Sequence, residues 1–217
     1  MNIPELKILA QQLACPTGEA GIEIAGQMYR SNGDMIRRSI DAMMLTSGCR
    51  ILEIGHGNGA HLGEIFSYSE NLHYTGLEIS QTMSLDAKHR NQDLYARGKA
   101  DFLVYDGEEL PFEENAFERI LSVNTVYFWK QPQEFLHQMY RILNDGGLLT
   151  LCFITPQSME RVPFTAFGFR NMETEELEEM CGYANFRSIV RQERTEHTLS
   201  KTGDPVTRTY IILNAKK

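Results

Sequence analysis

The sequence predicts an α/β fold, built on a doubly wound and mostly parallel sheet. Two observations predict it. Short apolar runs with the length of buried strands recur from Arg50 onward, and segments with helical spacing separate most of them. In addition, the first run leads directly into a glycine-rich turn, the usual passage from a strand to a helix in such folds. The expected strands are residues 50–54, 72–77, 101–105, 119–123 and 148–154.

Two helices are expected between these strands. Residues 82–95 follow Ser80, a good N-cap, and fill the link between the second and third strands. Residues 132–143 begin with Pro132 in the first turn and carry one broad apolar face. The sequence Asn144-Asp145-Gly146-Gly147 then predicts the end of this helix.

The flanks of this core have a different character. Before Arg50, residues 4–14, 19–28 and 34–45 are expected to be helical. After Thr155 an irregular, aromatic-rich stretch is followed by a helix from Thr174 and by two strand-like segments, 186–195 and 208–214. We expect one domain, with an N-terminal helical cap (1–47), a core (48–155) and a substrate-side insertion with the final strands (156–217).

Composition and charge narrow the class of protein. Of the 217 residues, 42% are hydrophobic and 23% are charged, as in ordinary globular proteins. The four cysteines form no Cys-x-x-Cys pair, and no secretory signal or membrane-length apolar run is evident. We therefore expect a reduced, cytoplasmic protein without a structural metal or membrane partner. The net charge of −8 argues against nucleic acid as a partner. The oligomeric state is left open.

The glycine turn is the strongest indication of chemistry. Gly55-His56-Gly57-Asn58-Gly59-Ala60 follows a strand that contains Glu53, and glycines let a backbone approach a ligand closely. The turn satisfies the dinucleotide fingerprint G-x-G-x-x-G/A and equally the pattern E-x-G-x-G-x-G of adenosylmethionine enzymes. Glu78 ends the second strand, where a carboxylate accepts hydrogen bonds from ribose hydroxyls in either class. The turn and Glu78 therefore leave both cofactors open.

Three features favour the second class. Asp106-Gly107 closes the third strand, so that an acid is available for an adenine amine, with Ile79 and Met83 available to sandwich the base. The chain leaves no room for a separate substrate domain after the sheet. Short-chain dehydrogenases need tyrosine and lysine four residues apart, whereas Tyr127 and Lys130 are three apart.

Four segments in order then carry a family resemblance: ILEIGHGNG, LEIS, YDGEELPF and ILSVNTVYFW, followed by a helix that ends in RILNDGGLL. Residues 50–155 resemble a class I S-adenosylmethionine-dependent methyltransferase, closest to the type 11 group of small-molecule enzymes. The resemblance implies a Rossmann-like sheet of seven strands with the last one antiparallel, under an N-terminal helical lid.

The resemblance also implies roles for the residues that match these segments. The backbone at Gly55 and Gly57 would contact the methionine part of the cofactor, and Glu53 would help to orient its ammonium group. The main-chain carbonyl of Asn124 would accept from that ammonium. The remaining roles implied are Glu78 on the ribose, Asp106 on the adenine amine, and His56 as a lining residue.

The expected reaction is an in-line methyl transfer to a small molecule, which releases S-adenosylhomocysteine. Tyr127 is the candidate catalytic residue, whereas Phe128 and Trp129 are expected to pack against the following helix. Asn124-Thr125-Val126-Tyr127 lacks the prolines of the N-P-P-Y motif, which argues against a nucleobase acceptor. The candidate acceptor-lining residues are Tyr29, Arg30, Tyr127, Phe164, Phe167 and Phe169.

The histidines are expected to be packed or at the surface, His61 and His137 among them. Two other functions remain open on the sequence alone. One is an NAD(P)-dependent oxidoreductase, because of the dinucleotide fingerprint. The other is a non-catalytic protein that binds the cofactor.

Overall fold

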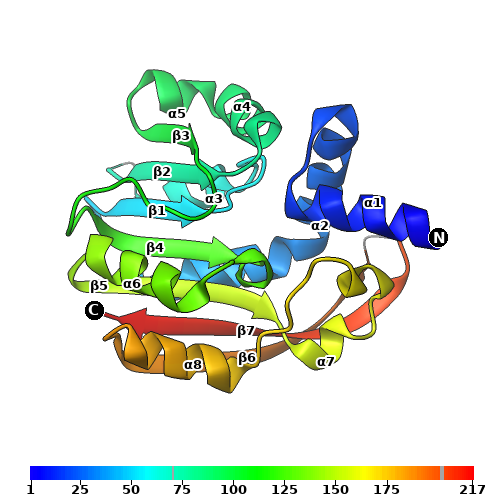
Figure 1. The fold of residues 1–217 in the computed structure, drawn as a ribbon. Coiled ribbons are helices and arrows are strands. Elements are labelled where there is room, and N and C mark those ends of the chain that lie inside the picture. Colours follow the sequence, from blue (N-terminus) through cyan, green and yellow to red (C-terminus); the bar gives the residue numbers. More distant parts are fainter. Residues whose placement is uncertain (70, 201–202) are drawn as a thin grey trace.

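Seven strands form one sheet in the computed structural model, which describes residues 1–69, 71–200 and 203–217. The strand order is β3-β2-β1-β4-β5-β7-β6, and β7 runs antiparallel to the other six strands (Figure 1). The predicted doubly wound, mostly parallel sheet with an antiparallel last strand is therefore confirmed. The strands are β1 (Arg50–Ile54), β2 (His73–Glu78), β3 (Ala100–Val104), β4 (Phe117–Val123), β5 (Leu143–Ile154), β6 (Arg187–Leu199) and β7 (Pro205–Lys216).

Helices cover both faces of the sheet. In Figure 1, α6 (Pro132–Ile142) and α8 (Thr174–Tyr183) lie in front of the strands, and α2 (Gly18–Ala42) lies behind them. The short helix α3 (Leu62–Phe66) and α4 (Gln81–Arg90) pack on the same face as α2. The remaining helices are α1 (Ile3–Ala14), α5 (Gln92–Ala96), α7 (Pro156–Met159) and the 3-10 turns η1 (Val126–Phe128) and η2 (Pro163–Ala166).

Strand β1 lies in the middle of the sheet and is buried on both faces. Leu52 and Ile54 pack into the core under α6 and α8, whereas Ile51 packs into the core under α2, α3 and α4. Side chains alternate between faces along a strand, so an unbroken apolar run is what a strand covered on both sides requires. This burial holds the carboxyl end of β1, and the glycine turn that follows it, in a fixed place.

Two of the expected helix boundaries were wrong. Segments 19–28 and 34–45 form one helix, α2, because Ala25, Met35 and Ile40 are buried along its whole length and hold the Ser31-Asn32-Gly33 region helical. Conversely, segment 82–95 divides into α4 and α5 at Asn91. The Asn91 side-chain amide donates to the carbonyls of Gly59 and Ala87, which ends α4 there.

The expected helix stop at residues 144–147 was correct in position but wrong in structure. Helix α6 ends at Ile142, yet residues 144–147 lie within β5 rather than in a loop. The pairing of β4 with β5 shifts register here, and Gly146 adopts a positive φ of 76°. The N–H of Gly146 donates to the carbonyl of Lys217, so the carboxyl terminus continues the sheet over the irregular segment.

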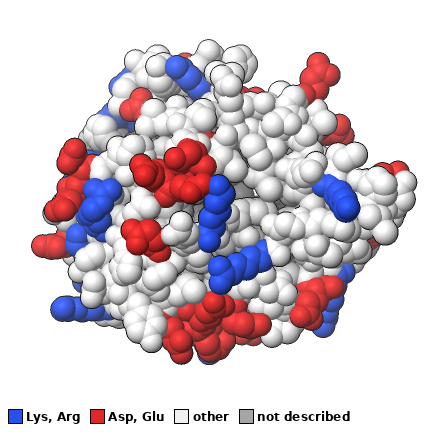
Figure 2. All heavy atoms as spheres, viewed as in Figure 1, with Lys and Arg blue, Asp and Glu red and all other residues white. Residues whose placement is uncertain are grey.

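Charge is unevenly distributed over the face seen in Figure 2. Acidic and basic side chains are mixed over most of it, and acidic ones gather over α8 at its lower edge. Helix α8 and its N-cap contribute Glu173, Glu175, Glu176, Glu178 and Glu179. None of the described helices is long and apolar enough to cross a membrane.

Candidate functional site

The glycine turn forms the floor of the site, at the carboxyl end of β1. Gly55, Gly57 and Gly59 have φ angles of 78°, 57° and 61°, in the left-handed region that favours glycine. A Cβ at Gly55 would lie 2.4 Å from Thr125 Cγ2, so packing excludes a side chain there. A Cβ at Gly57 would meet no protein atom within 4 Å. The open space beside Gly57 is the cavity, which suits the close approach of a ligand to the backbone.

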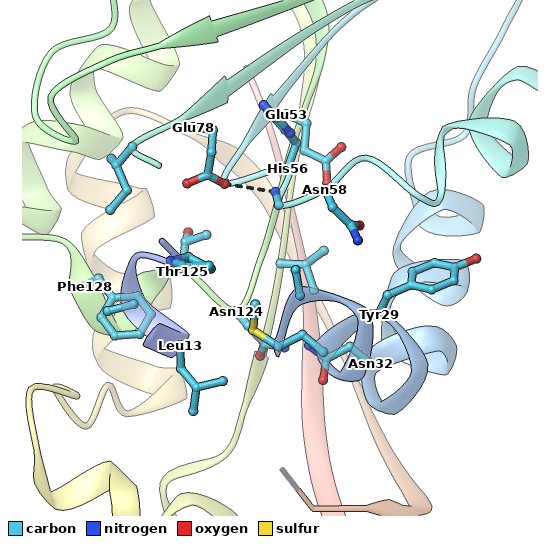
Figure 3. Close-up of a pocket in the computed structure, with 18 of the residues that line it drawn as sticks. Leu13, Tyr29, Asn32, Glu53, His56, Asn58, Glu78, Asn124, Thr125 and Phe128 are labelled. Atoms are coloured by element: carbon cyan, nitrogen blue, oxygen red, sulfur yellow. Dashed lines mark hydrogen bonds between the residues drawn. The ribbon is translucent and has the colours of Figure 1, made fainter. Parts of the chain in front are cut away.

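Glu78 ends the neighbouring strand β2 and faces this turn (Figure 3). One carboxylate oxygen accepts from the Gly57 N–H at 2.9 Å, and the other accepts from the Ser80 N–H at 3.1 Å. Burial raises the pKa of Glu78, and the backbone N–H donors oppose that shift. The two bonds fix the carboxylate at the edge of the cavity, with further lone pairs that can accept from hydroxyl groups.

A buried ion pair lies behind the turn. His61 Nε2 donates to Glu53 Oε2 at 2.7 Å, and the Tyr74 hydroxyl donates to the same oxygen at 2.6 Å. Burial opposes charge on both groups, but each holds the other ionised: Glu53 raises the pKa of His61, and His61 lowers the pKa of Glu53. His61 was correctly expected to be packed. Its partnership with Glu53 was missed, and the only signal was an acid and a histidine at the two ends of the turn.

His56 lies in the turn as a neutral, buried imidazole. Its ring packs over Gly76 and meets the ring of Phe102 edge-on, with 5.4 Å between centroids. Burial lowers its pKa to about 4. Neither ring nitrogen has a hydrogen-bond partner among the described residues. His56 lines the cavity, as expected, and its low pKa leaves it uncharged near neutral pH.

A first cavity, of about 170 Å³, opens between the carboxyl edge of the sheet and the N-terminal helices. Figure 3 shows Glu78 and the turn above Asn124 and Thr125, with Leu13 and Phe128 on one side and Tyr29 and Asn32 on the other. Most of the predicted cofactor residues come together here. Those that line the cavity are Glu53, Gly55, His56, Gly57, Glu78, Ile79, Gly107 and Asn124.

Two predicted cofactor residues do not line this cavity. The Asp106 carboxylate is exposed and accepts from the N–H groups of Glu108 and Glu109, at 2.8 and 2.9 Å, so it stabilises its own turn. Those two bonds also lower its pKa. Met83 is fully buried in α4. Tyr105 and Gly107, on either side of Asp106, line the cavity in its place.

A second cavity, of about 430 Å³, adjoins the first. Of the predicted acceptor residues, Tyr127, Phe164 and Phe169 line it, whereas Tyr29 lines the first cavity. Arg30 and Phe167 line neither; Phe167 packs beneath α1, where Lys7 Nζ lies 5.6 Å from its ring centroid. The two cavities share five lining residues, which we call the junction: Leu13, Met28, Asn32, Asn124 and Phe128.

Residues 127–129 differ in their surroundings. Tyr127 is 5% exposed; its hydroxyl donates to Asn124 Oδ1 at 3.1 Å and accepts from the Ile154 N–H at 2.5 Å. Burial raises the pKa of Tyr127 far above its ordinary value, so the geometry suits a structural role better than a proton acceptor. Trp129 packs on Phe135 of α6, as expected, and also lines the first cavity. The expectation for Phe128 was incomplete, because it lines both cavities.

Residues 52–151 match the Methyltransf_11 family model, described as a methyltransferase domain. This segment runs from β1 to β5 and includes the turn, Glu78 and Asn124. Phthiotriol/phenolphthiotriol dimycocerosates methyltransferase 1 of Mycobacterium ulcerans is 30% identical over 149 residues, or 66% of this chain and 51% of that protein. The chain thus spans about half the length of this relative. The family match, this relative and the shared fold together support a class I S-adenosylmethionine-dependent methyltransferase.

Solved methyltransferase structures share the fold of this chain. A chain of the complex between the Haloferax volcanii Trm112 methyltransferase activator and a methyltransferase superposes with a TM-score of 0.74 at 16% identity, over 88% of this chain and 92% of that one. Haemonchus contortus phosphoethanolamine N-methyltransferase 2, in complex with S-adenosylmethionine, gives 0.73 at 16% identity, over 98% of this chain and 60% of that one.

The methyltransferase-domain match, together with neighbours solved with S-adenosylhomocysteine or S-adenosylmethionine, supports S-adenosylmethionine as the cofactor and favours it over a nicotinamide cofactor at the glycine turn. The cavity fits such a group. Gly57 leaves open space where a side chain would intrude, and the Glu78 carboxylate is held at the cavity edge. Among the described residues, no group of His, Cys, Asp and Glu side chains is arranged to hold a metal ion.

Proposed function

We propose that this methyltransferase transfers the methyl group of S-adenosylmethionine to a small molecule that binds in the second cavity. The observation that carries the proposal is the junction: two adjoining cavities share five lining residues, and one cavity contains the glycine turn and Glu78. A donor and an acceptor bound in adjoining cavities meet at such a junction, and holding two reactants in line lowers the barrier to displacement.

In this proposal the chain's own groups bind the cofactor along the first cavity. The backbone of Gly55 and Gly57 contacts the methionine part, and Glu78 accepts from the ribose hydroxyls. The carbonyl of Asn124 and the Glu53 carboxylate orient the ammonium group. Tyr105, Ile79 and Gly107 surround the adenine, and Asp106 holds the turn that carries them rather than binding the base itself.

When bound, the cofactor supplies a methyl group on a sulfonium, whose sulfur leaves without needing a proton. The chain's part is then alignment and exclusion of water. Leu13, Met28 and Phe128 give the junction an apolar wall. Tyr127 orients the Asn124 side chain through its hydroxyl, while the Ile154 N–H fixes that hydroxyl in turn.

The test is a transfer assay with methyl-labelled S-adenosylmethionine and a panel of small acceptors that carry hydroxyl, amine, thiol or carboxylate groups. We expect label in one class of acceptor, with an equal amount of S-adenosylhomocysteine formed. If the protein binds the cofactor and transfers label to no member of the panel, a non-catalytic binding role replaces this proposal. Gly98→Ala, in an exposed turn remote from both cavities, serves as the control variant.

A further inference from the structure

The walls of the second cavity are mainly apolar, and they come from distant parts of the chain. The segment after β5 supplies six of the lining residues, and the facing ends of β6 and β7 also contribute. Burial of an alkyl or ring surface against such walls is favourable, by about 25 cal/mol for each Å² removed from water. The apolar lining residues are Leu13, Met28, Phe128, Ile154, Met159, Val162, Phe164, Phe169, Leu199 and Val206.

Two arginines also line this cavity, and they differ in their partners. Arg208 is 9% exposed and is fully engaged: its guanidinium donates to Glu196 Oε1 at 2.7 Å, to the Ser31 carbonyl at 2.7 Å and to Asn32 Oδ1 at 3.1 Å. Arg161 is exposed and makes no hydrogen bond or ion pair within the described parts of the chain. The described lining residues include no acid. Among its described lining residues, the cavity therefore presents one positive charge that no acid pairs with, at Arg161.

We propose that the second cavity takes an acceptor with an apolar body and a terminal oxyanion, and that Arg161 binds this oxyanion. The proposal rests on the function proposed above, since the second cavity is assigned to the acceptor. A guanidinium binds a carboxylate or a phosphate through two parallel hydrogen bonds, and such charge-assisted bonds are stronger than neutral ones. The apolar walls take the rest of the molecule.

The position of Arg161 also orients the acceptor. Arg161 lines only the second cavity, whereas Asn124 and Phe128 line both cavities. The oxyanion is thus held away from the junction, and the atom that receives the methyl group lies at the opposite end of the molecule. Arg161 is a specificity residue in this account and does not contact the reacting atoms.

Calorimetry on protein saturated with S-adenosylhomocysteine tests this inference with four probes of equal chain length: octanoate, octyl phosphate, octanol and octylammonium. We expect the better of the two anions to bind at least tenfold more tightly than octanol, and octylammonium to bind most weakly. Octanoate and octyl phosphate together show whether a carboxylate or a phosphate is preferred. Decanoate should bind more than tenfold more tightly than octanoate, at about fourfold for each methylene buried.

Variants then assign the preference to one side chain. Arg161→Gln should weaken binding of the preferred anion about tenfold and change octanol binding less than twofold. Arg187→Gln makes the same charge change at the exposed, far end of β6 and should leave both affinities unaltered. Thermal unfolding of both variants checks that they fold.

The inference is overturned if octanol binds as tightly as both anions, if octylammonium binds best, or if Arg161→Gln leaves anion affinity unchanged. These results are separable from failure of the proposed function. Binding of S-adenosylmethionine is measured on the same protein preparations before S-adenosylhomocysteine is added, and Arg161→Gln should retain it. Absence of that binding in the unaltered protein would refute the proposed function, whereas the anion preference of the second cavity would remain measurable.

Discussion

At the scale of single residues, the glycines of the turn differ in how much space a side chain would have. Gly55 has no room for a side chain beside Thr125, and Gly59 is crowded by Asn91 and Ala87. A Cβ at Gly57 would meet no protein atom within 4 Å, and Gly57 lines the first cavity. A substitution at Gly57 therefore acts on a ligand more than on packing.

Gly57→Ala should weaken S-adenosylmethionine binding at least tenfold, or about 1.4 kcal/mol, because the added methyl group occupies space next to the cofactor. Gly98 is the matched control. It has a similar φ of 64°, its Cβ would also meet nothing within 4 Å, and it lies in an exposed turn. Both substitutions place an alanine at a similar positive φ, so they should lower the stability of the fold by a similar amount. Gly98→Ala should nevertheless leave cofactor affinity intact. Equal affinities in the two variants would contradict this placement of the cofactor.

His56 should make the protein less stable in mild acid. Its pKa is about 4 when folded and about 6.5 in the unfolded chain, so the unfolded state binds more protons between these values. The contribution is fully retained above pH 6.5 and is lost as the pH falls toward 4, by roughly 3 kcal/mol in all. His56→Leu should remove this dependence from denaturant unfolding measured across that range. A variant whose curve stays parallel to that of the unaltered protein would show that His56 does not titrate this way.

Tyr127→Phe distinguishes a structural tyrosine from a catalytic base. Removing the hydroxyl leaves the half-buried Ile154 N–H without its acceptor, which should cost about 1–2 kcal/mol of stability. Because burial keeps this hydroxyl neutral, we expect the turnover rate to fall less than tenfold and the pH profile to keep its shape. A loss of a hundredfold or more, with the basic limb of the profile abolished, would instead identify Tyr127 as the base.

The sequence predicts the residues of the first cavity well where they follow directly from strand ends. Gly55, Gly57 and Glu78 are of this kind, since the carboxyl ends of parallel strands meet at one edge of the sheet. Asp106 also follows a strand, but its short side chain binds the backbone N–H groups of Glu108 and Glu109. The His61–Glu53 pair depends on how the turn folds back. Hydrogen bonds of this local kind produce no residue spacing that can be recognised in the sequence.

At the scale of elements, the N-terminal helices line the first cavity on one side, and we call them the lid. Leu13, Ala14 and Pro16, at and beyond the end of α1, line this cavity. The lid is tied to the core at the start of α4, where the Ser80 hydroxyl donates to the Pro16 carbonyl and the Gly18 N–H donates to Thr82 Oγ1. Ser80 also caps α4 by accepting from the Met83 N–H, so one residue couples the helix start to the lid.

Cofactor binding should therefore slow amide exchange in residues 13–18, because a bound ligand stabilises the closed lid that it contacts. Hydrogen–deuterium exchange with and without S-adenosylhomocysteine measures this, and α8, which lines neither cavity, provides an internal control. Unchanged exchange in residues 13–18, with protection confined to the glycine turn, would show that the lid takes no part in binding.

Element types were easier to predict than element boundaries, for a physical reason. Propensity marks Ser31-Asn32-Gly33 as a break, yet packing of α2 along the sheet outweighs it, as tertiary contacts often do. The sequence pattern does not indicate that the helix ends at Asn91. The side-chain hydrogen bonds from Asn91 to the carbonyls of Gly59 and Ala87 are seen only in the folded structure.

At the scale of the whole molecule, the sheet order accounts for the position of the site. The classical dinucleotide order 3-2-1-4-5-6 is modified here by β7, which inserts between β5 and β6. The strand order reverses between β1 and β4, which are parallel, and the first cavity lies at the carboxyl ends of these strands. The late strands β6 and β7 contribute walls to the second cavity, so in the proposed function the middle of the sheet binds the donor and the β6–β7 side helps to bind the acceptor.

The central claim is that the first cavity is built for S-adenosylmethionine, and Trp129 allows a direct test. It is the sole tryptophan, is 6% exposed and lines that cavity. Titration with S-adenosylmethionine, S-adenosylhomocysteine and NADH, followed by Trp129 emission and by calorimetry, compares the two cofactor classes on one protein. We predict saturable binding of both adenosyl-sulfur compounds and no competition from NADH. Tight binding of NADH, with no response to either adenosyl-sulfur compound, would contradict the account.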